Sequence, residues 1–487
     1  MIFYSPLALC CSELDNSTIN SYQTYAASAF GKLPLLATLE TAGSIFTAIC
    51  KPPISKMSDA MGRAETYLLM VMCYIISYVL SASATSFDTY VGASVFYAVA
   101  QSGTGMLNSI LVSDLSSART RGISWNLVYM PYFVTASVSA LIVDGVINTV
   151  GWRWGIGMFA IFLPASATLL IVMLFILQRR ASRAGVFLTK QCAVAGSIYE
   201  FCSRIDLGGL LLLSGGFGLL LVPITLAATT KYHWKTPWVD ALIILGILGL
   251  ATFYPYEKYQ AKYPIVPMDY FRKAPVFLGI ALGHIDSIGF SATHTYLYPW
   301  SVVTHNLSPR DAQFLTNTNG IVQCVMGMLT GVIIYKSRAY KWLSVGGAAI
   351  RLAGYAIMVE VRTAHSSRAQ LFLVQAVQGI GSGILETVVV VAAQVSVPHT
   401  ELAQVTSLVL LSNFMGNAIG AAVAGAIYTG TLAERLRALL RAVSAGNGKV
   451  PSTNLLDSLP VWGSKERTAV NEAVCYPEHA NTDLVVC

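Results

Sequence analysis

Charged side chains are scarce in this sequence. Asp, Glu, Lys and Arg make up 11% of the 487 residues, whereas an average soluble protein has roughly 25%. So few charges cannot cover a water-exposed surface, which excludes a cytosolic enzyme with an added anchor, a disordered chain and a secreted disulfide scaffold. Hydrophobic residues reach 55%. The chain is therefore predicted to be an all-α polytopic membrane protein, solvated mostly by the lipid bilayer.

The patterns of metal, nucleic-acid and catalytic sites are also missing. The nine cysteines show neither CxxC nor Cys/His spacing. The net charge of +7 is spread over short basic clusters between apolar runs and does not form one stripe. The sequence has no nucleophile–base constellation and no phosphate-binding loop. We therefore expect no resident metal, no cofactor, no nucleic-acid partner and no enzymatic activity.

Apolar runs long enough to cross a bilayer recur along the chain. A helix needs about 20 apolar residues to span the hydrocarbon core. Together with a short apolar stub at 2–12, such windows predict about thirteen spans. The full-length windows are 33–50, 66–83, 90–112, 123–149, 154–177, 207–228, 238–256, 276–298, 312–335, 342–360, 370–395 and 405–428.

The distribution of Lys and Arg between the loops predicts the orientation. With the N-terminus in the cytoplasm, the inner loops, which begin with Lys51, Lys56 and Arg63, carry more than twice as many basic residues as the outer loops. That bias is typical of cytoplasmic loops. In this topology the glycosylation sequon at Asn16 lies outside.

The loop between 33–50 and 66–83 contains a short motif. It reads Lys56–Arg63, KMSDAMGR, and resembles the D-x-x-G-R loop of the major facilitator superfamily. Its Asp59, Gly62 and Arg63 combine a helix-end acid, a tight glycine turn and a base. The resemblance implies that these three residues form a cytoplasmic gate motif. Ala60 stands where that family usually has a basic residue, which weakens the expected latch.

A closer resemblance extends over most of the chain, to the fungal siderophore–iron transporters of that superfamily. The segments that carry it are Leu14–Thr18 (LDNST), Trp152–Gly155 (WRWG), Asp206–Gly209 (DLGG), Tyr340–Trp342 (YKW), Gln375–Gly383 (QAVQGIGSG) and Ala403–Leu432. The resemblance implies proton-coupled uptake of ferric siderophores by alternating access, mainly at the plasma membrane, with an endosomal or vacuolar membrane as the alternative. The partners are then a ferric siderophore, protons and the bilayer, and we expect a monomer.

The same resemblance implies a major facilitator fold with two six-helix bundles and two extra helices. We expect an N-terminal bundle at 1–178, a cytoplasmic loop at 179–206, two linking helices at 207–256, a C-terminal bundle at 276–433 and an extracellular tail at 434–487. Fourteen spans and a full first helix are usual in that family. Both ends of this chain are therefore expected to be truncated, with the last helix missing.

Ionisable residues inside spans are costly and are therefore candidates for function. A symporter needs a carboxyl whose proton affinity changes between its two states, and burial or a nearby Arg changes that affinity. One or more of the acids is expected to titrate during transport and to pair with the only base within a span; the alternative is that each is a satisfied structural group. The candidates for proton coupling are Asp144, Asp286, Glu386, Glu40 and Arg351.

A metal chelate presents an organic shell, so its carrier needs aromatic and amide surfaces. The span 276–298 is rich in such groups, and its histidines titrate in a mildly acidic range. An ordinary aromatic belt at the interface is the competing interpretation. We expect the site between the spans 123–149, 276–298 and 370–395, in their outer half. The candidates for substrate binding are His284, His294, Tyr296, Tyr298, Gln375, Gln378, Tyr129 and Tyr132.

Other functions of the same superfamily stay open. Proton-coupled drug exporters carry a glycine-rich signature in the fifth helix, whereas residues 123–144 contain Pro131 and no glycine. An organic-anion or drug exchanger is therefore the second interpretation. A truncated, inactive paralogue that acts at most as a receptor is the third.

Overall fold

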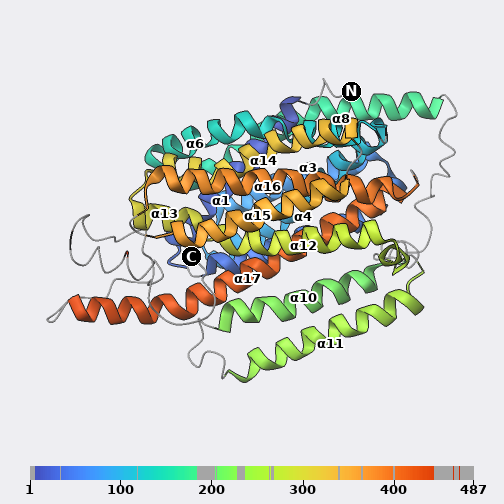
Figure 1. The fold of residues 1–487 in the computed structure, drawn as a ribbon. Helices are drawn as coiled ribbons and strands as arrows, with labels where there is room; N and C mark the ends of the chain where they lie inside the picture. The colour runs from blue at the N-terminus through green and yellow to red at the C-terminus, as the bar shows by residue number, and fades with distance from the viewer. Residues whose placement is uncertain are drawn as a thin grey trace.

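The computed structural model is built of helices that run side by side along a common axis (Figure 1). Most of them are long enough to cross a bilayer. All regular elements of the described chain are helical. The structure describes residues 6–32, 35–117, 119–183, 206–227, 236–262, 268–337, 340–363, 366–398 and 401–443, together with 203, 264, 464 and 471.

The first half of the chain packs around a core that is rich in tyrosine. α3 packs on α4 and α8, and α1 packs on α6 and α8. Pro131, which has no N–H to donate, marks the break between α5 and α6. The helices of this half are α1 (Pro6–Ala29), α2 (Leu36–Met61), α3 (Arg63–Ser83), α4 (Phe87–Leu115), α5 (Arg121–Tyr129), α6 (Pro131–Thr149), α7 (Trp152–Gly157) and α8 (Phe159–Arg183).

Two further helices form a pair at the side of the molecule. α10 (Leu207–Ala227) packs against α2 and α17 (Leu402–Val443), and α11 (Pro237–Tyr259) packs on α10 (Figure 1). The two approach closely at Gly246, where an added Cβ would lie 2.7 Å from the Leu220 nitrogen. Small residues allow such backbone contact between membrane helices.

The second half is organised around α16. This helix packs against α14, α15 and α12, and α12 also packs along α17. A capping box of Ser367 and Gln370 fixes the start of α16, and Asn306, in the left-handed conformation, ends α13. The remaining elements are η3 (Met268–Arg272), α12 (Ala274–His294), α13 (Leu297–His305), α14 (Pro309–Ser337), α15 (Tyr340–Val361) and α16 (Arg368–Val395).

The first helix differs from the prediction. In place of a stub at 2–12, α1 runs from Pro6 to Ala29 and passes through the segment that we expected outside the membrane. Asn16 therefore lies within a packed helix, where its Oδ1 accepts a hydrogen bond from Gln101 Nε2 at 2.8 Å. The hydropathy windows missed most of α1 because several of its polar side chains face the protein interior. Asp15, Thr18 and Ser21 are 1%, 0% and 3% exposed.

The second helix is also longer than expected. α2 continues to Met61 through Pro52 and Pro53, so Lys51 lies inside the helix bundle and is only 4% exposed. Its assignment to an inner loop was wrong. Eleven described helices or helix pairs are long and apolar enough to cross a membrane, and α1 and α2 are not among them because of their polar residues.

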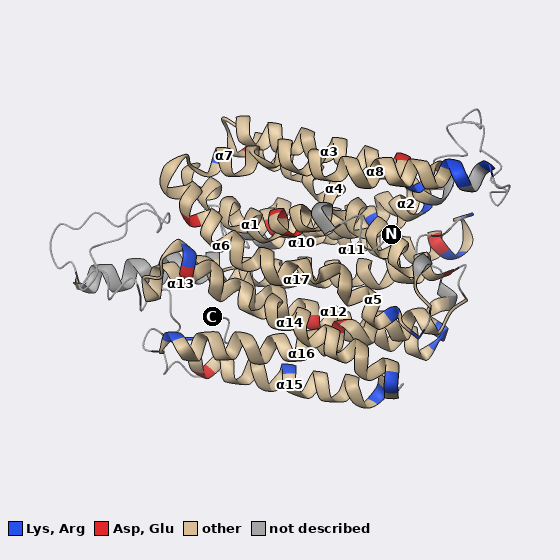
Figure 2. Ribbon diagram, turned by 90° about the horizontal axis from the view of Figure 1, so that it is seen from above, with Lys and Arg blue, Asp and Glu red and all other residues tan. Residues whose placement is uncertain are grey.

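Charges gather at the ends of the bundle and leave its middle almost neutral. Figure 2 shows most Lys and Arg at the end where α8 stops and α15 begins. This agrees with the basic inner loops expected from the sequence. The few acids in the middle stand out in the same view.

Candidate functional site

A cavity of about 350 Å³ lies between the two halves of the molecule, within the range of small-molecule pockets. Both halves contribute polar and aromatic side chains to its wall. From the first half come Glu13, Asn16, Lys51, Tyr74, Gln101, Asn108 and Tyr129; from the second come Asp286, Phe290, Gln323, Ser382, Glu386, Asn413, Phe414 and Asn417.

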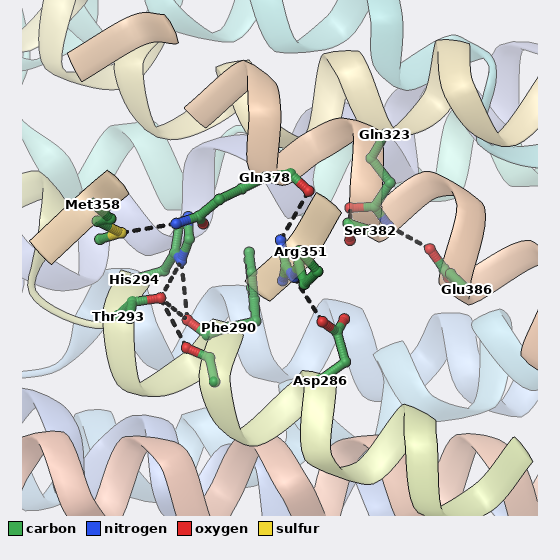
Figure 3. Close-up of polar contacts among 11 residues, drawn as sticks. Asp286, Phe290, Thr293, His294, Gln323, Arg351, Met358, Gln378, Ser382 and Glu386 are labelled. Atoms are coloured by element: carbon green, nitrogen blue, oxygen red, sulfur yellow. Dashed lines mark hydrogen bonds and ion pairs between the residues drawn. The ribbon is translucent and has the colours of Figure 1, made fainter. Parts of the chain in front are cut away.

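An ion pair joins α12 and α15 beside this cavity. Arg351 Nε lies 2.6 Å from Asp286 Oδ1, and Arg351 Nη1 donates to the Gln378 carbonyl at 3.0 Å. The expected pairing of Arg351 with one of the acids is thus confirmed. The Arg351 side chain is 4% exposed and that of Asp286 is 19% exposed. Asp286 lines the cavity and Arg351 is not among the lining residues; Figure 3 shows the ion pair.

A second acid reaches the cavity from α16. The Glu386 carboxylate accepts a hydrogen bond from the Gln323 amide of α14, and the Gln323 carbonyl oxygen accepts one from the Ser382 hydroxyl at 3.0 Å. Figure 3 shows these two hydrogen bonds next to the Asp286–Arg351 ion pair. Two acids of the second half thus differ in partner among the described residues: Asp286 has a cation, whereas Glu386 has the neutral amide of Gln323.

Two predicted acids lie elsewhere. Asp144 does not line the cavity; its Oδ1 accepts from Asn148 Nδ2 at 3.2 Å on the same helix. Glu40 lies in α2 against Thr295, at the end of α12, and is also outside the cavity lining. The structure therefore brings Asp286, Glu386 and Arg351 together and leaves the other two apart.

Among the candidates for substrate binding, Tyr129 lines the cavity and the others have partners elsewhere. His294 Nε2 lies 2.8 Å from Gln375 Oε1, and its ring stacks on Phe290 at 4.2 Å. The other five contacts are Tyr132 with Asn317 at 3.3 Å, Gln378 with the Met358 sulfur at 2.9 Å, Tyr296 stacked on Tyr428 at 3.9 Å, Tyr298 with Tyr25 at 3.4 Å, and His284 with the Ser412 carbonyl at 2.8 Å.

Apart from Tyr129, sequence reasoning missed the polar residues that the first half contributes. Glu13 and Asn16 were hidden because the polar run around them resembles a loop, and Lys51 was counted as a loop base. Asn413 and Asn417 lie one helical turn apart in α17 and face the same cavity. The signal that could have found them is the recurrence of polar residues every three or four positions within an otherwise apolar helix.

Polar contacts between the halves lie on both sides of the cavity. On the side toward the end of α1, Ser21 donates to Gln313, and Asn317 Nδ2 donates to Ser139 at 3.0 Å. On the opposite side, Gln394 Nε2 donates to Ser113 at 3.3 Å. Gly331 of α14 also touches α5 there: an added Cβ would lie 2.9 Å from the Gly122 carbonyl carbon.

The D-x-x-G-R segment forms the turn between α2 and α3. Gly62 has a φ of 117°, which favours glycine, and Arg63 Nη1 donates to Ser58 Oγ at 2.7 Å. The side chain of Asp59 lies outside the described residues. Near the same turn, Gln178 of α8 donates to Glu65 at 2.8 Å, so a hydrogen-bonded cluster ties three helices together at this end.

Groups of three or more His, Cys, Asp or Glu side chains suited to a metal ion do not occur in the part of the chain that the structure describes. The cavity instead offers carboxylates, amides and aromatic rings. Such a set can bind a polar organic molecule and can exchange protons, while bare metal coordination would need several converging donors.

The chain matches the model of the Major Facilitator Superfamily over residues 7–289 and 276–433. It is 30% identical to the MFS siderochrome iron transporter C of Aspergillus fumigatus, over 95% of this chain and 77% of that protein. It is 32% identical to the low affinity heme transporter str3 of Schizosaccharomyces pombe, over 88% of this chain and 70% of that protein. A bacterial homologue of the human lysosomal transporter Spinster, in an inward-facing unoccupied conformation, has the same fold: TM-score 0.55, 16% identity, covering 97% of this chain and 93% of that one.

Proposed function

The chain belongs to the siderophore–iron transporter family of the major facilitator superfamily, and on that premise we propose that it carries ferric siderophores across a membrane together with protons. The relatives named for siderochrome or siderophore transport support the substrate class. We place it in the plasma membrane, as a monomer that imports its substrate.

One observation carries the proposal: ionisable residues of both halves face one cavity between them. Glu13 and Lys51 come from the first half, and Asp286 and Glu386 from the second. A secondary transporter exposes one central site alternately to the two sides by moving its halves against each other. A site shared by both halves changes its surroundings in that movement, so its carboxyls can bind a proton in one state and release it in the other.

We assign the coupled proton to Asp286 and Glu386. When Asp286 is ionised, its attraction for Arg351 holds α12 to α15; when it is protonated, that attraction is lost and the two helices can separate. Glu386 has a neutral amide partner, so its protonation breaks no ion pair. Asp144 and Glu40, which lie away from the cavity, take no part in this proposal.

Uptake of radiolabelled iron tests the proposal directly. Iron-starved cells that lack other importers and express this chain should accumulate iron from ferric siderophores, and a protonophore should abolish the accumulation. The exposed Asp88 offers a matched control, since Asp88→Asn should transport normally while Asp286→Asn should not. A chain that reaches the membrane without raising iron uptake is an exporter or an inactive paralogue.

Heme is a second candidate substrate. It is favoured by the relative from Schizosaccharomyces pombe that is named a low affinity heme transporter, to which this chain is 32% identical. The same cells distinguish the two candidates when labelled heme replaces the siderophore. Uptake of heme alone would replace the siderophore proposal.

A further inference from the structure

A buried lysine without a counterion lies in the wall of the cavity. Lys51 is 4% exposed and lines the cavity from α2. Its Nζ lies 4.4 Å from the centre of the Phe414 ring of α17, an attractive but neutral contact. Within the described ranges Lys51 forms no hydrogen bond and no ion pair, so its charge is left uncompensated.

The cavity carboxylates do not compensate this charge. Asp286 is bound to Arg351 at 2.6 Å, and Glu386 accepts from Gln323. Glu13 also lines the cavity, and within the described residues no ion pair joins it to Lys51. The acids of the cavity wall come from α1, α12 and α16, and Lys51 of α2 is the only cation among its described lining residues.

Two asparagine amides share the cavity with the lysine. Asn413 and Asn417 flank Phe414 on α17 and line the same cavity, and neither side chain has a hydrogen-bond partner among the residues that the structure describes. The Nδ2 of each amide is therefore available to donate to an anionic ligand. A ligand in the cavity that carries acceptor atoms can use these two donors.

We propose that Lys51, with Asn413 and Asn417, is a subsite for an anionic group of the transported iron chelate, most simply a free carboxylate. The proposal rests on the proposed function and narrows its substrate class to chelates that carry negative charge outside the iron centre. A carboxylate fits because it supplies the countercharge of Lys51 and accepts hydrogen bonds from both asparagine amides. The cation also disfavours chelates with a positive group at this position, since like charges repel strongly where water is excluded.

A matched pair of probes isolates the charge. Ferrichrome is a neutral ferric trihydroxamate, whereas ferrichrome A holds iron in the same way and carries free carboxylates. We expect the wild-type chain to take up ferrichrome A in preference. Lys51→Met should lower that preference about tenfold, the typical effect of losing a hydrogen bond to a charged group, and Lys51→Arg should retain it. Lys341→Met is the control, because Lys341 is exposed on α15 and lies outside the cavity.

Binding of each chelate to the purified chain can be measured by the quenching of tryptophan fluorescence. This measurement separates the inference from the proposed function. If neither chelate is transported but ferrichrome A binds more tightly and Lys51→Met removes the difference, the proposed function fails and the subsite stands. If Lys51→Met weakens both chelates equally, or neither, Lys51 has only a structural role and the inference is overturned.

Discussion

At the scale of single residues, the two members of the Asp286–Arg351 pair are not equivalent. Asp286→Asn leaves a buried guanidinium, 4% exposed, that cannot lose its proton. Breaking a buried pair in this way lowers the free energy of unfolding by about 3–5 kcal/mol. Arg351→Met leaves an acid that can become neutral by taking up a proton, so it should cost less. Thermal unfolding of the purified variants should rank Asp286→Asn below Arg351→Met.

The double variant provides the control for that ranking. Asp286→Asn combined with Arg351→Met leaves no unpaired charge, so its melting temperature should lie above that of Asp286→Asn alone. Additive losses in the double variant would show that the two side chains do not interact in the folded protein.

Glu386 is expected to affect coupling more than folding. Its partner Gln323 can also hydrogen-bond to an amide, so Glu386→Gln should preserve stability. In proteoliposomes, accumulation driven by an imposed pH gradient should fall at least about tenfold, while exchange of labelled for unlabelled substrate, which needs no net proton movement, should persist. The exposed Glu360 supplies the matched variant Glu360→Gln. Equal loss of exchange and accumulation would show that Glu386 acts in substrate binding and not in proton coupling.

At the scale of helices, the sequence predicted the helices in which apolar residues dominate, including α16 in the packed interior, and failed for α1, whose inward face is polar. The runs 66–83 and 370–395 agree with α3 and α16 because their apolar residues dominate any window. α1 escaped detection because Asp15 and Ser21 point inward, where a polar group is paired by neighbouring helices. The mean hydropathy of a window does not distinguish an inward polar face from a loop. The same reason hid Glu13 and Lys51 from the predicted site.

The contact of α5 with α14 depends on the absence of side chains. Gly331→Ala would place a Cβ 2.9 Å from the Gly122 carbonyl carbon, so the helices must move apart at a cost of about 1–3 kcal/mol. We expect a lower melting temperature and slower uptake. Gly346→Ala on α15 is the control, because nothing lies within 4 Å of an added Cβ there. Normal stability and uptake in Gly331→Ala would mean that this approach is not needed for packing or transport.

At the scale of the whole molecule, the predicted meeting point of spans 123–149, 276–298 and 370–395 was informative but incomplete. Tyr129, Asp286 and Glu386 from these spans do line one cavity. Its remaining wall comes from α1, α2, α3, α4, α14 and α17, whose contributions depend on how the halves face each other. Spacing along a helix fixes which residues share a face, whereas the choice of partner helix depends on contacts between residues far apart in the sequence.

Alternating access makes a prediction about both sets of contacts between the halves. Ser21 meets Gln313 on one side of the cavity, and Ser113 meets Gln394 on the other. If transport needs both sides to open in turn, a thiol-specific cross-linker applied to Ser21→Cys with Gln313→Cys should stop uptake. The same should hold for Ser113→Cys with Gln394→Cys, and a cleavable cross-linker followed by reductant should restore transport in both.

The single-cysteine variants control for the reagent itself, since the chain has cysteines of its own, Cys50 and Cys324 among them. They should transport normally after treatment. The informative comparison is between the two cross-linked cysteine pairs. Because each cross-link holds a different side closed, either one must stop a carrier that moves its halves as rigid units. If uptake persists after one pair is fully cross-linked, the substrate passes without separation of the two halves on that side. Transport would then use a local gate and not the rocking of the two halves.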